Sequence, residues 1–132
     1  MLLHLADYAL IVFHTALVLF NCTGWIWHRT RKLHLITMAA TAISWLLLGL
    51  WFGRGYCVFT DLHWRVRTAL GQHVTEDTYV QYLVAKLTGW TPSAQLATNV
   101  AGIVFVLAQV LSIVLNLRDR QARLHERQVT QS

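Results

Sequence analysis

The sequence predicts an all-α integral membrane protein, with three transmembrane helices and two short amphipathic helices that cap the outer, periplasmic face. Hydrophobic residues make up 55% of the 132 residues and charged residues 13%, and the charged fraction is about half that of a usual soluble domain. Three stretches without Asp, Glu, Lys or Arg, at 8–27, 33–52 and 94–117, reach the length of about 20 residues that a hydrocarbon core requires. We therefore expect a single membrane domain over residues 1–132.

The first span, 8–27, carries a stripe of polar residues. Asp7, His14, Asn21 and His28 recur every seven residues, which is nearly two helical turns, so they share one face of a helix. Because an unpaired imidazole or amide in hydrocarbon costs several kcal/mol, this face is expected to turn toward the other spans. The segment before the span lacks the basic residues of a secretory signal, so we expect the span to be retained.

The other two spans carry comparable stripes. The second span, 33–52, has His34, Thr37, Thr41 and Ser44. The third span, 94–117, has Gln95, Gly102, Gln109 and Asn116 at intervals of seven, with Asn99 and Ser112 near the same face. Such residues commonly join transmembrane helices through hydrogen bonds. The tail, 118–132, is expected to continue the third span for a turn or two and then fray.

His14 is the residue for which a functional interpretation competes with a structural one. At 1.5 Å per residue it lies about 9 Å inside the outer edge of its span, level with Asn99 and Gly102 of the third span. In the structural interpretation, neutral His14 hydrogen-bonds to Asn99. In the functional one, His14, Asn99 and Gly102 form a cofactor-binding or proton-handling site. A quinone needs one imidazole, whereas a haem held by two histidines would need His34, which is expected at the opposite end of the bundle.

The segment between the second and third spans, 53–90, predicts two helices. The first covers 60–70 and is ended by Gly71, and the second covers 75–88 and is ended by Gly89. Each has an apolar face but is too short to cross a bilayer. We therefore expect both helices to lie flat over the outer mouth of the bundle.

The distribution of charge predicts the orientation. With the N-terminus outside, the inner segments hold Arg29, Arg31, Lys32, Arg118, Arg120, Arg123 and Arg127 against two acidic residues. The outer segments hold Arg54, Arg65, Arg67 and Lys86 against four acidic residues. The positive-inside rule therefore favours this orientation, with a cytoplasmic C-terminus. It also explains the net charge of +5 without a nucleic-acid partner.

Motifs for catalysis and metal binding do not stand out. His4, Asp7, Cys57, His63 and His73 are all expected on the outer side, but their spacing is not that of a metal site. Cys22 and Cys57 fall at different depths, which argues against a disulfide. The chain also lacks a nucleophile elbow, a phosphate-binding loop and a carboxylate pair. We therefore do not expect an enzyme.

Two functions remain open at this point. The first is a small non-enzymatic subunit or self-assembling module of a membrane complex, with the lipid bilayer and other membrane subunits or further copies as its partners. Its basis is size, because three spans can enclose little more than one side-chain-sized cavity. The alternative is a redox or proton-transfer subunit that binds a quinone or a haem near His14.

The stretch "RGYCVFTDLHWRVR" after a tryptophan-rich span, with "FHTALVLF" and "LHL" before it, resembles a family of small bacterial inner-membrane proteins known only as a domain of unknown function. The positions that match its motifs are His14, His34, Leu35, Cys57, Thr60 and Arg67. This chain departs from the family at Val58, where the family has proline, and at His63, where it has glutamate. The resemblance implies one shared architecture and no activity.

Overall fold

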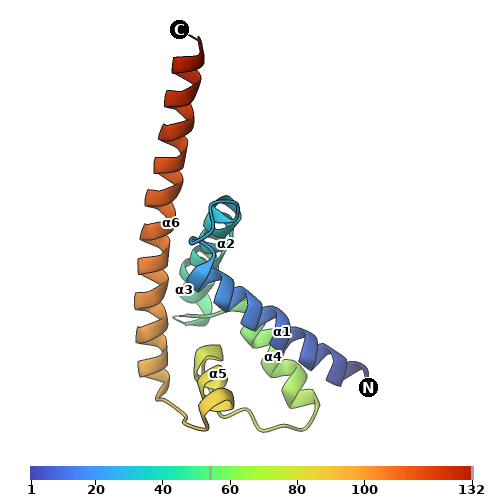
Figure 1. Cartoon of the computed structure of the whole chain (residues 1–132). Coiled ribbons are helices and arrows are strands. Elements are labelled where there is room, and N and C mark those ends of the chain that lie inside the picture. The colour runs from blue at the N-terminus through green and yellow to red at the C-terminus, as the bar shows by residue number, and fades with distance from the viewer. Residues whose placement is uncertain (54, 132) are drawn as a thin grey trace.

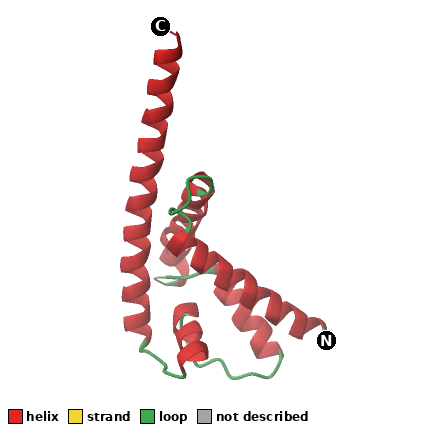
Figure 2. Cartoon of the chain, viewed as in Figure 1, coloured by secondary structure: helices red, strands yellow, loops and turns green. Residues whose placement is uncertain are grey.

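The computed structural model describes residues 1–53 and 55–131, and these residues form helices and loops (Figure 2). The elements are α1 (Leu2–Thr23), α2 (Arg31–Ile43), the π-helical turn η1 (Ser44–Leu48), α3 (Gly49–Phe52), α4 (Val58–Ala69), α5 (Tyr79–Thr88) and α6 (Ala94–Gln131). Arg54 and Ser132, which were counted in the outer segment and the tail, lie outside the described residues.

Three helices are long and apolar enough to cross a membrane: α1, the continuous helix Arg31–Phe52, and α6. This confirms the prediction of an all-α membrane protein with three spans. The first helix begins six residues before the predicted boundary at Tyr8 and ends at Thr23, before the predicted end at Trp27. It ends there because Thr30 and Arg31 bind the carbonyl oxygens that follow, those of Gly24 and Trp25, and turn the chain back.

Figure 1 shows α6 running the length of the molecule, with α1 slanting against it and α2 continuing into α3 beside both. The N- and C-termini lie at opposite ends of the molecule. The seam between α2 and α6 buries Met38 completely against a helix whose own buried residues are small: Ala97, Ala108 and Ser112. Small side chains let two helix backbones approach closely, as is typical of membrane helix pairs.

Two short helices occupy the segment between the spans, as predicted, with shifted N-termini. α4 begins at Val58 rather than at residue 60, with Cys57 as its N-cap. α5 begins at Tyr79 rather than at residue 75, because the hydroxyl of Thr78 accepts the backbone N–H of Gln81 and caps the helix there. Their placement over the periplasmic face of a bilayer stays a prediction.

The position of α4 differs from a helix laid over the mouth of the bundle. Figure 1 shows α4 lengthwise beside the first half of α1, with α5 between α4 and the start of α6. Phe59 near the start of α4 meets Phe13, and His63 one turn later meets Asp7. α4 is therefore antiparallel to α1 and is packed on the side of the first span.

The tail does not fray within the described residues, contrary to expectation, because α6 continues to Gln131. Neither glycine nor proline occurs after Gly102, and Arg, Gln, Leu and Glu in the tail are good helix formers. A helix that is already nucleated in the span extends at little cost.

Candidate functional site

His14 lies in a buried aromatic junction between α1, α4 and α5. Its residue is 5% exposed, and its ring stacks on that of Tyr79, with centroids 3.7 Å apart and planes tilted by 16°. The ring of Phe59 approaches it as well, at a centroid distance of 6.3 Å. The imidazole therefore faces the protein interior, as predicted from the polar stripe.

The hydroxyl of Tyr79 fixes this stack to α1. It donates a hydrogen bond to the carbonyl oxygen of Ile11 at 3.1 Å. Thr15 Oγ1 lies 2.8 Å from the same hydroxyl, and since the tyrosine proton is already used, the threonine is the donor. Burial raises the pKa of Tyr79, with the Thr15 hydrogen bond acting in the opposite direction. The phenol thus stays protonated and continues to donate.

The two nitrogens of His14 have different surroundings. Nε2 lies 3.9 Å from the Sγ of Cys57, which occupies the N-cap position of α4. Nδ1 is buried and has no hydrogen-bond partner among the residues that the structure describes. Because a partner on the second nitrogen normally fixes the tautomer of a histidine, nothing described here locks His14 into one form.

A second buried histidine, His63 of α4, pairs with a carboxylate of α1. His63 is fully buried, and its Nε2 lies 2.8 Å from Asp7 Oδ1. A carboxylate oxygen accepts, so His63 donates from Nε2, while its Nδ1 has no partner among the described residues. Burial lowers the pKa of His63, and the hydrogen bond to Asp7 opposes this shift. This pair ties α4 to the first span.

Arg67 of α4 packs against two aromatic rings, one on α4 and one on α5. Its guanidinium carbon lies 4.6 Å from the ring centroid of Tyr82 and 5.5 Å from that of Trp64, and a guanidinium over an aromatic face is attracted to it. Its Nε donates to Gln72 Oε1 at 2.9 Å, and its Nη1 lies 3.8 Å from Glu76. Arg67 therefore holds α4, the following loop and α5 together.

His34 lies in a separate network at the other end of α1. It is fully buried, with Nε2 2.9 Å from the carbonyl oxygen of Asn21 and Nδ1 2.9 Å from Ser112 Oγ. A carbonyl can only accept, so Nε2 donates to Asn21 and the Ser112 hydroxyl donates to Nδ1. Asn21 lies in the last turn of α1, where carbonyl groups lack helical donors. His34 therefore caps α1 and joins all three spans.

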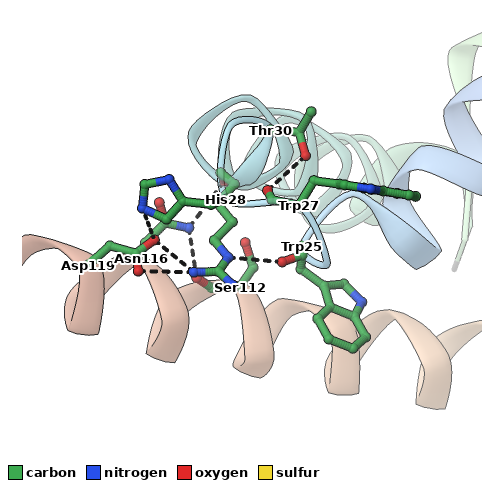
Figure 3. A network of polar contacts seen from close by, with 8 residues as sticks. Trp25, Trp27, His28, Thr30, Ser112, Asn116 and Asp119 are labelled. Atoms are coloured by element: carbon green, nitrogen blue, oxygen red, sulfur yellow. Dashed lines mark hydrogen bonds and ion pairs between the residues drawn. The ribbon is translucent and has the colours of Figure 1, made fainter.

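Figure 3 shows the polar contacts around this network, where the loop after α1 meets α6. Arg31 donates from Nη1 to both carboxylate oxygens of Asp119, at 2.9 and 3.0 Å, and from Nε to the carbonyl oxygen of Trp25. His28 Nε2 lies 3.4 Å from the same carboxylate. Asn116 donates to the carbonyl oxygen of Arg31. Together these contacts fix the position of α6 along its own axis relative to the loop.

The structure does not bring Asn99 or Gly102 to His14, so the predicted hydrogen bond between His14 and Asn99 is wrong. Asn99 is exposed, and with Gly102 it lines a shallow groove on the outer surface of α6. The reason is its position on the helix, because Asn99 follows buried Ala97 by two residues, about 200° around α6. The buried face of α6 instead follows Ala97, Ala108 and Ser112.

The surroundings of His14 do not fit a haem or a quinone. A haem ligand needs an imidazole nitrogen that faces open space, but Nε2 faces Cys57 and Nδ1 is enclosed. His34 cannot serve as a second ligand, because both of its nitrogens are hydrogen-bonded. A quinone needs a slot beside the imidazole, and on one face of the ring Tyr79 already lies in stacking contact.

Sequence reasoning missed Tyr79 as a partner of His14, and no periodicity could have paired them, because the contact joins different helices. Of the outer residues that were considered together, Asp7 and His63 meet each other, and Cys57 meets His14, which was not in that set. Within 1–53 and 55–131, no group of three or more His, Cys, Asp or Glu is placed to hold a metal ion.

Comparison with known proteins gives one family. A family model described as "Protein of Unknown function (DUF2784)" matches residues 4–117. No curated protein and no solved structure matches the chain. The match covers all three spans and both outer helices, which includes every residue of the two histidine networks except Asp119.

Proposed function

The chain belongs to this family of unknown function, and we propose that it acts as a non-enzymatic subunit of a membrane complex in the bacterial inner membrane. In this proposal, a transmembrane helix of another subunit or of another copy covers the face of α6 that is turned away from the other helices of this chain. One observation carries the proposal: a candidate span displays polar side chains, including Asn99, on a surface that no other part of the described chain covers.

The groove is built as helix contacts in membranes commonly are. It is lined by Thr98, Asn99, Gly102, Ile103, Val106 and Leu107. An amide left in hydrocarbon without a partner costs several kcal/mol, so Asn99 is better satisfied by a neighbouring helix than by lipid. A Cβ built on Gly102 would meet nothing within 4 Å, which leaves room for another backbone to approach.

The test is association of the purified protein in lipid nanodiscs or a mild detergent, measured by chemical cross-linking and native mass. Asn99→Leu and Gly102→Leu are expected to weaken association with another copy or with a co-purifying subunit. Val104→Leu is the matched control, because Val104 is exposed on the same helix but does not line the groove. Association that survives both groove substitutions would refute the proposal.

The alternative function, a redox or proton-transfer subunit with a quinone or haem near His14, is less well supported. The junction around His14 is filled by Tyr79, Phe59 and Cys57. The groove on α6 lies elsewhere and is not lined by His14. The absorption spectrum of the purified protein distinguishes the two functions for haem.

A further inference from the structure

Cys57 stands directly against the buried histidine of the first span. Its Sγ lies 3.9 Å from Nε2 of His14, at the far limit of a hydrogen bond to sulfur. Cys57 is half-buried, whereas His14 is 5% exposed. The thiol and the imidazole therefore form a pair with one partly exposed residue and one buried residue.

The imidazole is positioned to exchange a proton with this thiol. Nε2 is directed at Sγ, and Nδ1 has no hydrogen-bond partner among the described residues, so no second bond commits the ring to one tautomer. The stacked ring of Tyr79, 3.7 Å away, presents an aromatic face to an imidazolium. Such a face stabilises a neighbouring cation.

The position of Cys57 at a helix N-terminus favours negative charge on the same sulfur, and its side chain makes no capping hydrogen bond that would occupy it. Cys57 is the N-cap residue of α4, a helix of 12 residues, and its φ of −127° and ψ of 124° are those of a residue entering a helix. The first-turn N–H groups of a helix lack helical acceptors and form the positive end of its dipole. A helix N-terminus and an adjacent histidine are two of the settings that activate a cysteine.

We propose that Cys57 is a nucleophilic thiol, that His14 Nε2 accepts its proton, and that its substrate class is a disulfide. Sγ attacks one sulfur of the disulfide, a new S–S bond forms as the original one breaks, and the leaving thiolate takes the proton from His14. Cys57 is thereby oxidised to a mixed disulfide, and the released half of the substrate is reduced to a thiol. This activity goes beyond the proposed subunit role and does not depend on the groove of α6.

The test measures the rate at which the folded protein reacts with dithiodipyridine, a neutral disulfide that releases a chromophore. A Cys22→Ser background leaves Cys57 as the single thiol. Because a positioned base contributes about 10²-fold or more, His14→Gln is expected to slow the reaction by about that factor near neutral pH and to change its pH profile. His4→Gln is the matched control, since His4 is exposed on the same helix, and it should react at the unsubstituted rate.

Two results with the purified protein would overturn the proposal. One is a folded His14→Gln protein that reacts as fast as its parent. The other needs no variant: the parent protein reacting no faster than the same chain unfolded in a denaturing detergent. A further measurement uses native membranes that are treated with a disulfide and quenched with acid, and it determines the mass of the Cys57 peptide. An added mass supports the proposal and tells a small thiol from a partner polypeptide, whereas a Cys57 thiol that stays free contradicts it.

Discussion

Three buried histidines are used in three different ways. His34 has both nitrogens hydrogen-bonded, so its tautomer is fixed and its role is to join helices. His63 donates one hydrogen bond, to Asp7. The partner of His14 among the described residues is the Cys57 thiol, 3.9 Å from Nε2. An imidazole with a committed tautomer is suited to structure, whereas one with a free nitrogen is suited to proton exchange.

The space around two glycines predicts different effects of substitution, because Gly24 is packed against His34 and Gly102 is open. A Cβ at Gly24 would lie 2.8 Å from Cδ2 of His34 and 2.7 Å from the carbonyl oxygen of Phe20. We expect Gly24→Ala to lower the free energy of unfolding by about 1 to 3 kcal/mol through overpacking. Gly102→Ala meets nothing within 4 Å and should be neutral or stabilise α6 by up to about 1 kcal/mol. Thermal unfolding followed by circular dichroism in one detergent compares them, and equal losses would contradict this account.

At the scale of elements, α6 is the helix that joins the first two spans to each other and to α5. α2 packs against its middle through His34 and Ser112, and the loop after α1 is fixed to it through Arg31 and Asp119. The loop before its start is tied to the first turn of α5, where Gln81 donates to the carbonyl oxygen of Pro92. Its polar contacts with the first two spans run from Ser112 to Asp119, whereas Phe105 meets Trp45 nearer its start. The polar contacts therefore fix the registry of the spans from the middle of α6 onward.

The hydroxyl of Ser112 is expected to contribute measurably to this registry. Ser112→Ala leaves Nδ1 of fully buried His34 without its donor, and an unsatisfied buried polar group costs about 1 to 3 kcal/mol. Thr130→Ala on the same helix is the control, because this exposed hydroxyl bonds only within α6 and should change stability by about 0.5 kcal/mol or less. Chemical denaturation of both variants measures the difference, and a Ser112→Ala protein as stable as the control would exclude the role.

The whole molecule consists of three spans joined at one end by a polar network, with a smaller helical unit attached at the other. The outer unit is held to α1 by the Asp7–His63 pair and the His14–Tyr79 stack. The two histidine networks thus occupy opposite ends of the first span. Because α1 runs between them, the two networks fix both ends of that helix against its neighbours.

The orientation of the molecule is predicted from its charges. The loop after α1, the first turn of α2 and the end of α6 carry seven of the eleven basic residues, so all three are expected in the cytoplasm and Cys57 outside. Impermeant thiol reagents applied to intact cells should therefore label Cys57 in preference to Cys22. Reporter fusions at the C-terminus should be active only in their cytoplasmic form, and an external C-terminus would overturn the orientation.

The number of spans and the inward direction of the polar stripe on α1 could be read from the sequence, because both depend on local properties. Hydropathy over about 20 residues identifies a span whatever it packs against. The spacing of seven placed Asp7, His14 and Asn21 on one face of α1, and all three make polar contacts with another element. His28 was expected on the same face, but α1 ends at Thr23 and His28 lies in the following loop, where it contacts Asp119. Gly71 and Gly89 also end the outer helices as expected, with positive φ values of 73° and 74°.

The partners of these residues were decided by the tertiary structure. Counting residues inward assumes parallel helices, and it placed Asn99 beside His14, but α4 and α5 occupy that side of α1 and supply Cys57 and Tyr79 instead. On α6, the spacing of seven drifts around the helix, so the same pattern includes exposed Gln95 and inward Asn116. A sequence repeat fixes which residues share a face, whereas the neighbour of that face depends on where the chain returns after its loops.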